Sequence, residues 1–371
     1  MKDLIRANAG LLFAGVATFM LMGAGQSLYG PALPVYGRDL SLGPTQTGWI
    51  VSAHWIGCAI GVGLMYFHSS RVGPRSVLAM MALGAAMLAA SAGVIATYAG
   101  AAVFGMGYGM ATVVFNPRIL RAFGARGTSM LSLLNATFGI GAIVAPLVFV
   151  WLGSRPDLAF GIMALLAVAI WLGSGAASRT AATPSDKTGA GTFRPMLAFQ
   201  LFAVAGIGLE ATLIGLGPSA LIRAGLAEQT AAQLLSAFFV AFLGIRVILI
   251  FTAHLAAPFT LYIGAMIAAA ASAFLAAFVS PGIFFVVMGL SAGLFFPSFY
   301  VAASALMGDD PRTPSTIIAA GLVGGIAAPI VLSPLLSALG GSGFFVVLGC
   351  VASLAAGAAV VIRQRLRELR G

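Results

Sequence analysis

Long apolar runs, each with at most one charged residue, alternate with short polar segments along the whole chain. A helix needs ~20 residues to cross the hydrocarbon core of a bilayer, and three of the runs are long enough for two such helices. These three runs contain predicted turns near residues 97–100, 280–282 and 340–343. The pattern therefore predicts twelve transmembrane helices within residues 7–37, 40–70, 76–117, 127–154, 158–178, 195–222, 229–258, 259–307 and 313–362.

A polar segment rich in Ser, Thr, Gly and Pro lies near the middle of the chain, at residues 179–195. This composition is typical of a flexible linker. We therefore predict two six-helix halves, residues 1–178 and 196–371, joined by a linker on the same side of the membrane as both termini.

Glycines recur in the two halves at a nearly constant offset of half the chain. Gly105 and Gly109 correspond to Gly289 and Gly293, and at almost the same offset Gly141 corresponds to Gly324. Parallel repeats of this kind occur in large families of secondary transporters. The sequence thus predicts an all-α polytopic membrane protein with two pseudo-symmetric halves.

The composition excludes an ordinary soluble domain, because 60% of the residues are hydrophobic and only 8% are charged, against about 25% charged in soluble domains. The net charge of +10 comes from basic residues spread singly between apolar runs, so we expect no nucleic-acid partner. Cys58 and Cys350 each lie in an apolar run, which predicts neither a disulfide framework nor a metal site.

Most Lys and Arg residues fall in predicted loops on the side of the two termini. Cytoplasmic loops carry such an excess of positive charge. We therefore expect a multi-pass protein of the cell (inner) membrane with both termini in the cytoplasm, present as a monomer.

Glu210 is the only ionisable residue within 195–222 and lies near the middle of that predicted span. An ionised carboxylate at this depth costs several kcal/mol unless it binds a proton or a partner. Glu210 is therefore a candidate for proton coupling, and a hydrogen-bonded packing role is the alternative.

Further polar and aromatic residues are candidates for the same site. Gln26 occupies the position in helix 1 that corresponds to Glu210, and an interhelical hydrogen bond is its alternative role. His54 can exchange protons at physiological pH or serve as a structural residue. Arg246 lies inside a span, where we expect a structural role at the cytoplasmic gate. The other candidates for substrate binding are Tyr29, Tyr108, Asn116, Asn135, Phe296 and Tyr300.

Residues 70–75, Ser-Arg-Val-Gly-Pro-Arg, resemble a degraded form of the signature that the major facilitator superfamily carries between helices 2 and 3. The usual acidic residue is replaced by Ser70, so the charge network that normally braces the cytoplasmic side must be weaker or use other partners. The resemblance implies the twelve-helix major facilitator fold and a gate or structural role for Arg71 and Arg75.

Within that superfamily, four segments resemble the fucose/glucose-type sugar symporters, at residues 48–54, 135–141, 206–210 and 244–246. The fucose-permease branch has acidic residues in helices 1 and 4, where this chain has Gln26 and Asn116, which argues against fucose itself. Drug/proton antiporters have an arginine early in helix 4 and a Gly-Pro-x-x-Gly-Gly motif in helix 5, and both signatures are missing.

These observations lead us to expect a secondary transporter that moves a small polar solute, most simply a sugar or sugar-like compound, by proton-coupled alternating access. Sodium is the alternative coupling ion. An exporter of a small organic metabolite or drug is the alternative function, and a non-transporting scaffold or assembly factor is the alternative from another class. We expect no enzymatic activity, no cofactor and no metal.

Overall fold

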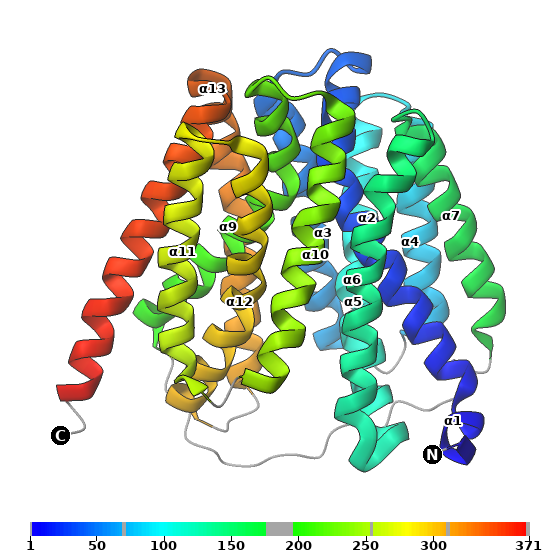
Figure 1. Ribbon diagram of the computed structural model, residues 1–371. Coiled ribbons are helices and arrows are strands. Elements are labelled where there is room, and N and C mark those ends of the chain that lie inside the picture. Colours follow the sequence, from blue (N-terminus) through cyan, green and yellow to red (C-terminus); the bar gives the residue numbers. More distant parts are fainter. Residues whose placement is uncertain (1, 69–71, 176–195, 253–254, 309–311, 369–371) are drawn as a thin grey trace. The chain divides into compact units, whose positions relative to one another are not determined.

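The computed structural model describes residues 2–68, 72–175, 196–252, 255–308 and 312–368. All regular secondary structure in these residues is helical, as Figure 1 shows. The chain forms two compact units, unit 1 at residues 1–186 and unit 2 at residues 187–371. The predicted linker, residues 179–195, lies outside the described residues, as does Arg71.

Unit 1 contains six long helices preceded by one short helix. A 3-10 turn, η1, connects α5 to α6. The elements are α1 (Lys2–Ala7), α2 (Ala9–Asp39), α3 (Pro44–His68), α4 (Pro74–Ala90), α5 (Val94–Phe123), η1 (Gly124–Arg126), α6 (Gly127–Trp151) and α7 (Pro156–Gly173).

Unit 2 contains the second set of six helices, of which the last two are continuous in α13. Gly340 has non-helical dihedral angles, φ 70° and ψ −170°, and divides α13 into two helices. The elements are α9 (Leu197–Arg223), α10 (Glu228–Thr252), α11 (Pro258–Phe278), α12 (Pro281–Met307) and α13 (Arg312–Glu368).

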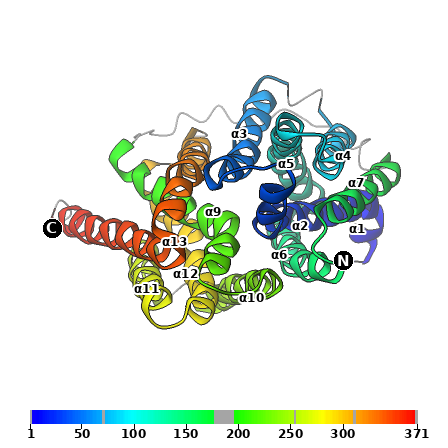
Figure 2. The ribbon, with the colours of Figure 1, turned by 90° about the horizontal axis from the view of Figure 1, so that it is seen from above.

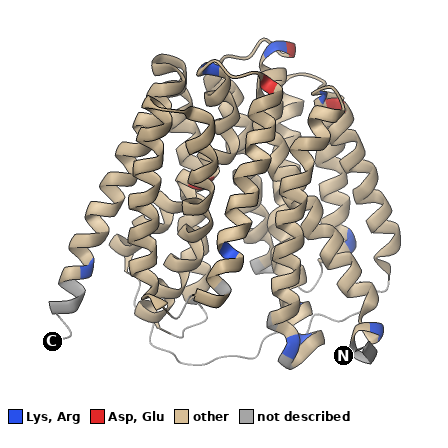
Figure 3. Cartoon of the chain, in the orientation of Figure 1, with Lys and Arg blue, Asp and Glu red and all other residues tan. Residues whose placement is uncertain are grey.

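The predicted count of twelve helices is confirmed. In the described residues, ten helices are long and apolar enough to cross a membrane when α13 is counted once, and α4 is a shorter apolar helix. Gly340 makes two helices of α13, at the predicted turn. Figure 3 shows that the Lys, Arg, Asp and Glu positions lie mainly at helix ends in each unit, with long uncharged stretches of helix between them.

The predicted turn near residues 97–100 is wrong. The chain turns instead between α4 and α5, where Ser91 has a φ of 44° and Gly93 a φ of 109°. Gly100 lies inside α5, and a Cβ at this position would lie 2.9 Å from the Cβ of Met87 on α4. The glycine at 100 therefore permits close helix packing, whereas the left-handed conformation of a turn is supplied by Ser91 and Gly93.

Close backbone contacts at glycine hold unit 1 together. A Cβ at Gly105 of α5 would overlap the carbonyl oxygen of His54 on α3, and one at Gly141 of α6 would overlap that of Met20 on α2. Figure 2 shows the resulting order, with α5 between α3 and α4. Small residues at helix interfaces drive packing within membranes, because burial of apolar side chains gains little there.

Unit 2 uses the same contacts at the corresponding positions. A Cβ at Gly289 of α12 would overlap the carbonyl oxygen of Phe238 on α10, and one at Gly324 of α13 would overlap that of Val204 on α9. Like α5 in unit 1, α12 packs against two neighbours, α10 and α11. The glycine repeat seen in the sequence is therefore a repeat of helix contacts in each unit.

Candidate functional site

A polar and aromatic cluster lies inside unit 1, on α2, α3 and α5. The hydroxyl of Tyr108 donates a hydrogen bond of 2.9 Å to Oε1 of Gln26. The ring of His54 lies 5.1 Å from that of Tyr108 and 5.1 Å from that of Tyr29, centroid to centroid. Four residues predicted separately from the sequence are therefore neighbours, and we call Gln26, Tyr29, His54 and Tyr108 the polar cluster.

Two members of the polar cluster have buried polar atoms without a hydrogen-bond partner. The side chain of His54 is 1% exposed and neither ring nitrogen is hydrogen-bonded; Tyr29 is 2% exposed and its hydroxyl is likewise unpaired. Unpaired buried polar groups cost free energy and are concentrated where a protein has a function for them. His54 and Tyr29 are therefore the members of the polar cluster for which a functional role is most worth testing.

The sequence places His54 in the cluster through the glycine contacts of α3 with α5. Because Gly105 has no side chain, α5 approaches the backbone of α3 at His54 and brings Tyr108, one turn further along α5, against the imidazole. The rings of Phe104 and Trp55 lie 5.9 and 5.5 Å from His54 and complete its surroundings. The imidazole is thus held between aromatic rings.

The other predicted residues of unit 1 lie outside the polar cluster. Asn135 is exposed, and its amide donates to the carbonyl of Leu131 in its own helix. Asn116 precedes Pro117 in α5, and its Oδ1 is buried without a partner. The guanidinium of Arg75 lies 5.2 Å from the ring of Trp171, a cation–π contact between α4 and α7.

In unit 2, Glu210 lies in the middle of α9. Its Oε2 is buried and has no hydrogen-bond partner. A proton or a hydroxyl group of a solute is the kind of partner that Oε2 lacks.

Arg246 makes two contacts within unit 2. Its Nε donates a hydrogen bond of 3.0 Å to the carbonyl of Gly293 on α12, and its guanidinium lies 4.1 Å from the ring centroid of Phe242 on its own helix. The hydrogen bond ties α10 to α12. The predicted aromatic residues Phe296 and Tyr300 lie one turn apart on α12 with ring centroids 5.5 Å apart.

Sequence reasoning missed several residues that surround the polar cluster. Phe138 on α6 stacks edge-on with Tyr108 at 6.3 Å, and Phe160 on α7 lies 5.8 Å from Tyr29. The position of Phe104 beside Gly105 is the signal that could have placed it here, since this glycine marks the contact with α3. A further buried polar residue, Gln200 at the start of α9, donates to the sulfur of Met307.

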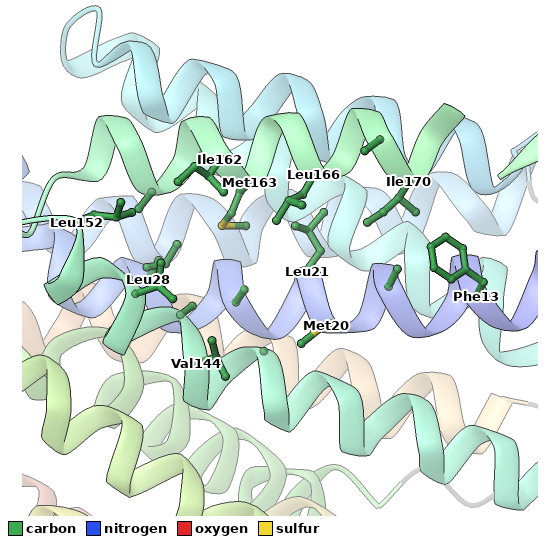
Figure 4. A pocket seen from close by; sticks show the side chains of 17 residues that line it. Phe13, Met20, Leu21, Leu28, Val144, Leu152, Ile162, Met163, Leu166 and Ile170 are labelled. Atoms are coloured by element: carbon green, nitrogen blue, oxygen red, sulfur yellow. The ribbon is translucent and has the colours of Figure 1, made fainter. Parts of the chain in front are cut away.

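A large apolar pocket of about 450 Å³ lies elsewhere in unit 1, between α2, α6 and α7. Figure 4 shows its side chains, among them Leu21, Val144 and Ile162, pointing into one space from these three helices. None of the predicted site residues lines it, and its lining offers almost no polar atoms. The pocket is therefore unsuited to a polar solute.

Among the described residues, no group of three or more His, Cys, Asp or Glu side chains could hold a metal ion. The polar cluster and Glu210 offer hydrogen-bonding groups and, in the cluster, aromatic rings.

Comparisons with known proteins place this chain in context. The sequence model of the Major Facilitator Superfamily matches residues 15–329. The comparison with curated protein sequences found no match.

Similar solved structures include three transporters. The nucleoside transporter NupG is 16% identical with a TM-score of 0.73, and the match covers 96% of this chain and 98% of that one. The D-xylose-proton symporter is 15% identical with a TM-score of 0.73, covering 94% and 96%. A variant of the E. coli fucose:proton symporter FucP is 17% identical with a TM-score of 0.63, covering 94% and 98%. At such identities the likeness concerns the fold.

Proposed function

Because this chain belongs to the major facilitator superfamily of membrane transporters, we propose that it carries a small sugar or sugar-like solute across the membrane together with a proton. The polar cluster of unit 1 binds the solute in this proposal, and Glu210 of unit 2 exchanges the proton. The protein is accordingly a transporter and not an enzyme.

The observation that carries the proposal is the composition of the polar cluster. An amide, two phenols and an imidazole lie beside the aromatic rings of Trp55 and Phe104, within a buried part of an otherwise apolar unit. Hydroxyl groups of a sugar can pair with the unbonded atoms of His54 and Tyr29, and its apolar ring face can lie against an aromatic side chain. No member of the cluster carries a fixed charge, which suits a neutral solute.

The similar structures support this solute class. NupG is a nucleoside transporter, and the other two proteins are symporters for D-xylose and fucose. These solutes share a sugar ring, and both symporters are coupled to a proton. These solutes define the first compounds to test.

Glu210 supports the coupling step in the proposal. Its buried Oε2 without a hydrogen bond is a site for a proton, and a neutral carboxyl can cross an apolar environment at lower cost than a carboxylate. The family moves solutes by alternating exposure of the binding site to the two sides. A proton bound while the site faces the acidic side is then released on the alkaline side.

The decisive experiment is uptake of labelled sugars and nucleosides by proteoliposomes under imposed pH gradients. We expect accumulation when the outside is acidic, with no accumulation when the gradient is absent or collapsed by a protonophore. Accumulation only under the opposite gradient would instead establish export by proton antiport. A full screen without transport or a solute-induced thermal shift would favour a scaffold.

A further inference from the structure

Pro297 interrupts the hydrogen-bond ladder of α12. Proline has no N–H, so the carbonyl four residues earlier, that of Gly293, loses its helical partner. Gly293 is buried, and a buried carbonyl without a partner costs free energy. The helix nevertheless continues from Pro281 to Met307. A donor from outside α12 must therefore satisfy this carbonyl.

Arg246 of α10 supplies this donor. Its Nε lies 3.0 Å from the Gly293 carbonyl oxygen, and its guanidinium is held over the ring of Phe242, one turn earlier on the same helix. Gly293 also lets the two helices approach, since a Cβ there would lie 2.6 Å from the carbonyl oxygen of Phe242. Proline inside a membrane helix is tolerated where neighbouring groups pair with the freed backbone.

We infer that Arg246 is a positioning residue, which replaces the missing N–H of Pro297 and fixes the proline-containing part of α12 against α10. The hydrogen bond places the partly buried guanidinium between α10 and α12. Its hydrogen bond accounts for the presence of an otherwise costly cation within a membrane span.

A double-mutant cycle on the purified full chain tests the hydrogen bond. Arg246→Met should lower the melting temperature, because the Gly293 carbonyl loses its donor. Pro297→Ala restores an N–H within α12, so adding Arg246→Met to it should cause at most about half of that loss. Equal losses in the two backgrounds would overturn the inference. If Arg246→Met does not fold, the same cycle can be measured with Arg246→Gln, which can still donate a hydrogen bond and should lower the melting temperature less.

Discussion

The two units share a backbone frame and differ in the side chains attached to it. Gly105 meets the carbonyl of His54 in unit 1, and at the corresponding place in unit 2 Gly289 meets the carbonyl of Phe238. The backbone contact is the same, but a polar imidazole in one unit is replaced by a phenyl ring in the other. The repeat therefore fixes the helix packing and leaves the chemistry of each unit free to diverge.

The divergence extends to the other members of the polar cluster. Gln26 corresponds to Glu210, Tyr29 to Leu213 and Tyr108 to Ala292. Unit 1 therefore has a group of uncharged hydrogen-bonding side chains, whereas unit 2 has a carboxylate, Glu210, in the middle of α9. Because the two kinds of group lie in different units, the proposed roles in solute binding and proton exchange can be tested independently.

The largest effect should come from the carboxylate of unit 2. Glu210→Gln keeps the shape and hydrogen-bonding capacity of the side chain but removes the exchangeable proton, so we expect proton-driven accumulation to be abolished while exchange of solute continues. Uptake and counterflow in proteoliposomes measure the two activities. Glu228→Gln, at the start of α10, is the matched control and should retain accumulation. Unchanged accumulation in Glu210→Gln would remove Glu210 from the coupling step.

The shared frame should respond alike in both units. Gly105→Ala and Gly289→Ala place a methyl group against a backbone carbonyl and force the helices apart, so each should lower the melting temperature of the purified protein by several degrees or prevent folding. Gly63 and Gly264 have no atom within 4 Å of an added Cβ, and alanine there should be neutral or stabilising by about 0.5–1 kcal/mol. If only one of the two substitutions lowered the melting temperature, the helix contacts at Gly105 and Gly289 would not be equivalent.

Much of this frame could be predicted from the sequence. The apolar runs predicted the twelve helices, and the glycines at 340–343 predicted the division of α13. The turn between α4 and α5 was misplaced, because Gly100 is used for packing while Ser91 adopts a left-handed conformation that its side chain does not signal. Glycine has both uses, and a single sequence does not separate them.

The site could be predicted as separate residues but not as a group. Gln26 and Tyr108 were each candidates, yet their hydrogen bond depends on how α2 and α5 are rotated about their axes. In a soluble helix an apolar stripe reveals that rotation, whereas membrane helices are apolar on the lipid face as well. For the same reason the sequence did not indicate that Asn135 is exposed and bonded within its own helix.

A smaller effect is expected when unit 1 is made to resemble unit 2. His54→Phe installs the residue found at the corresponding position 238, and it removes two buried nitrogens that have no partner. The melting temperature should therefore be retained or raised, because an unsatisfied polar group is lost. Solute affinity should fall by roughly tenfold, the equivalent of about 1.4 kcal/mol. Solute affinity can be measured by thermal shift. An affinity unchanged from that of the wild type would contradict the assignment of His54 to solute binding.

The smallest effect should come from the hydrogen bond within the polar cluster. Tyr108→Phe keeps the ring against His54 and removes only the hydroxyl that donates to Gln26, so the fold should be unaffected and the amide of Gln26 should become less well oriented. A neutral hydrogen bond contributes about 1 kcal/mol, which corresponds to roughly a fivefold rise in KM. The matched control is Tyr98→Phe, because the hydroxyl of Tyr98, near the start of α5, donates to the carbonyl of Gln46 at the start of α3, outside the polar cluster. Equal KM values for Tyr108→Phe and Tyr98→Phe would mean that the orientation of Gln26 does not matter for the solute, and the binding role would then fall to His54 and Tyr29.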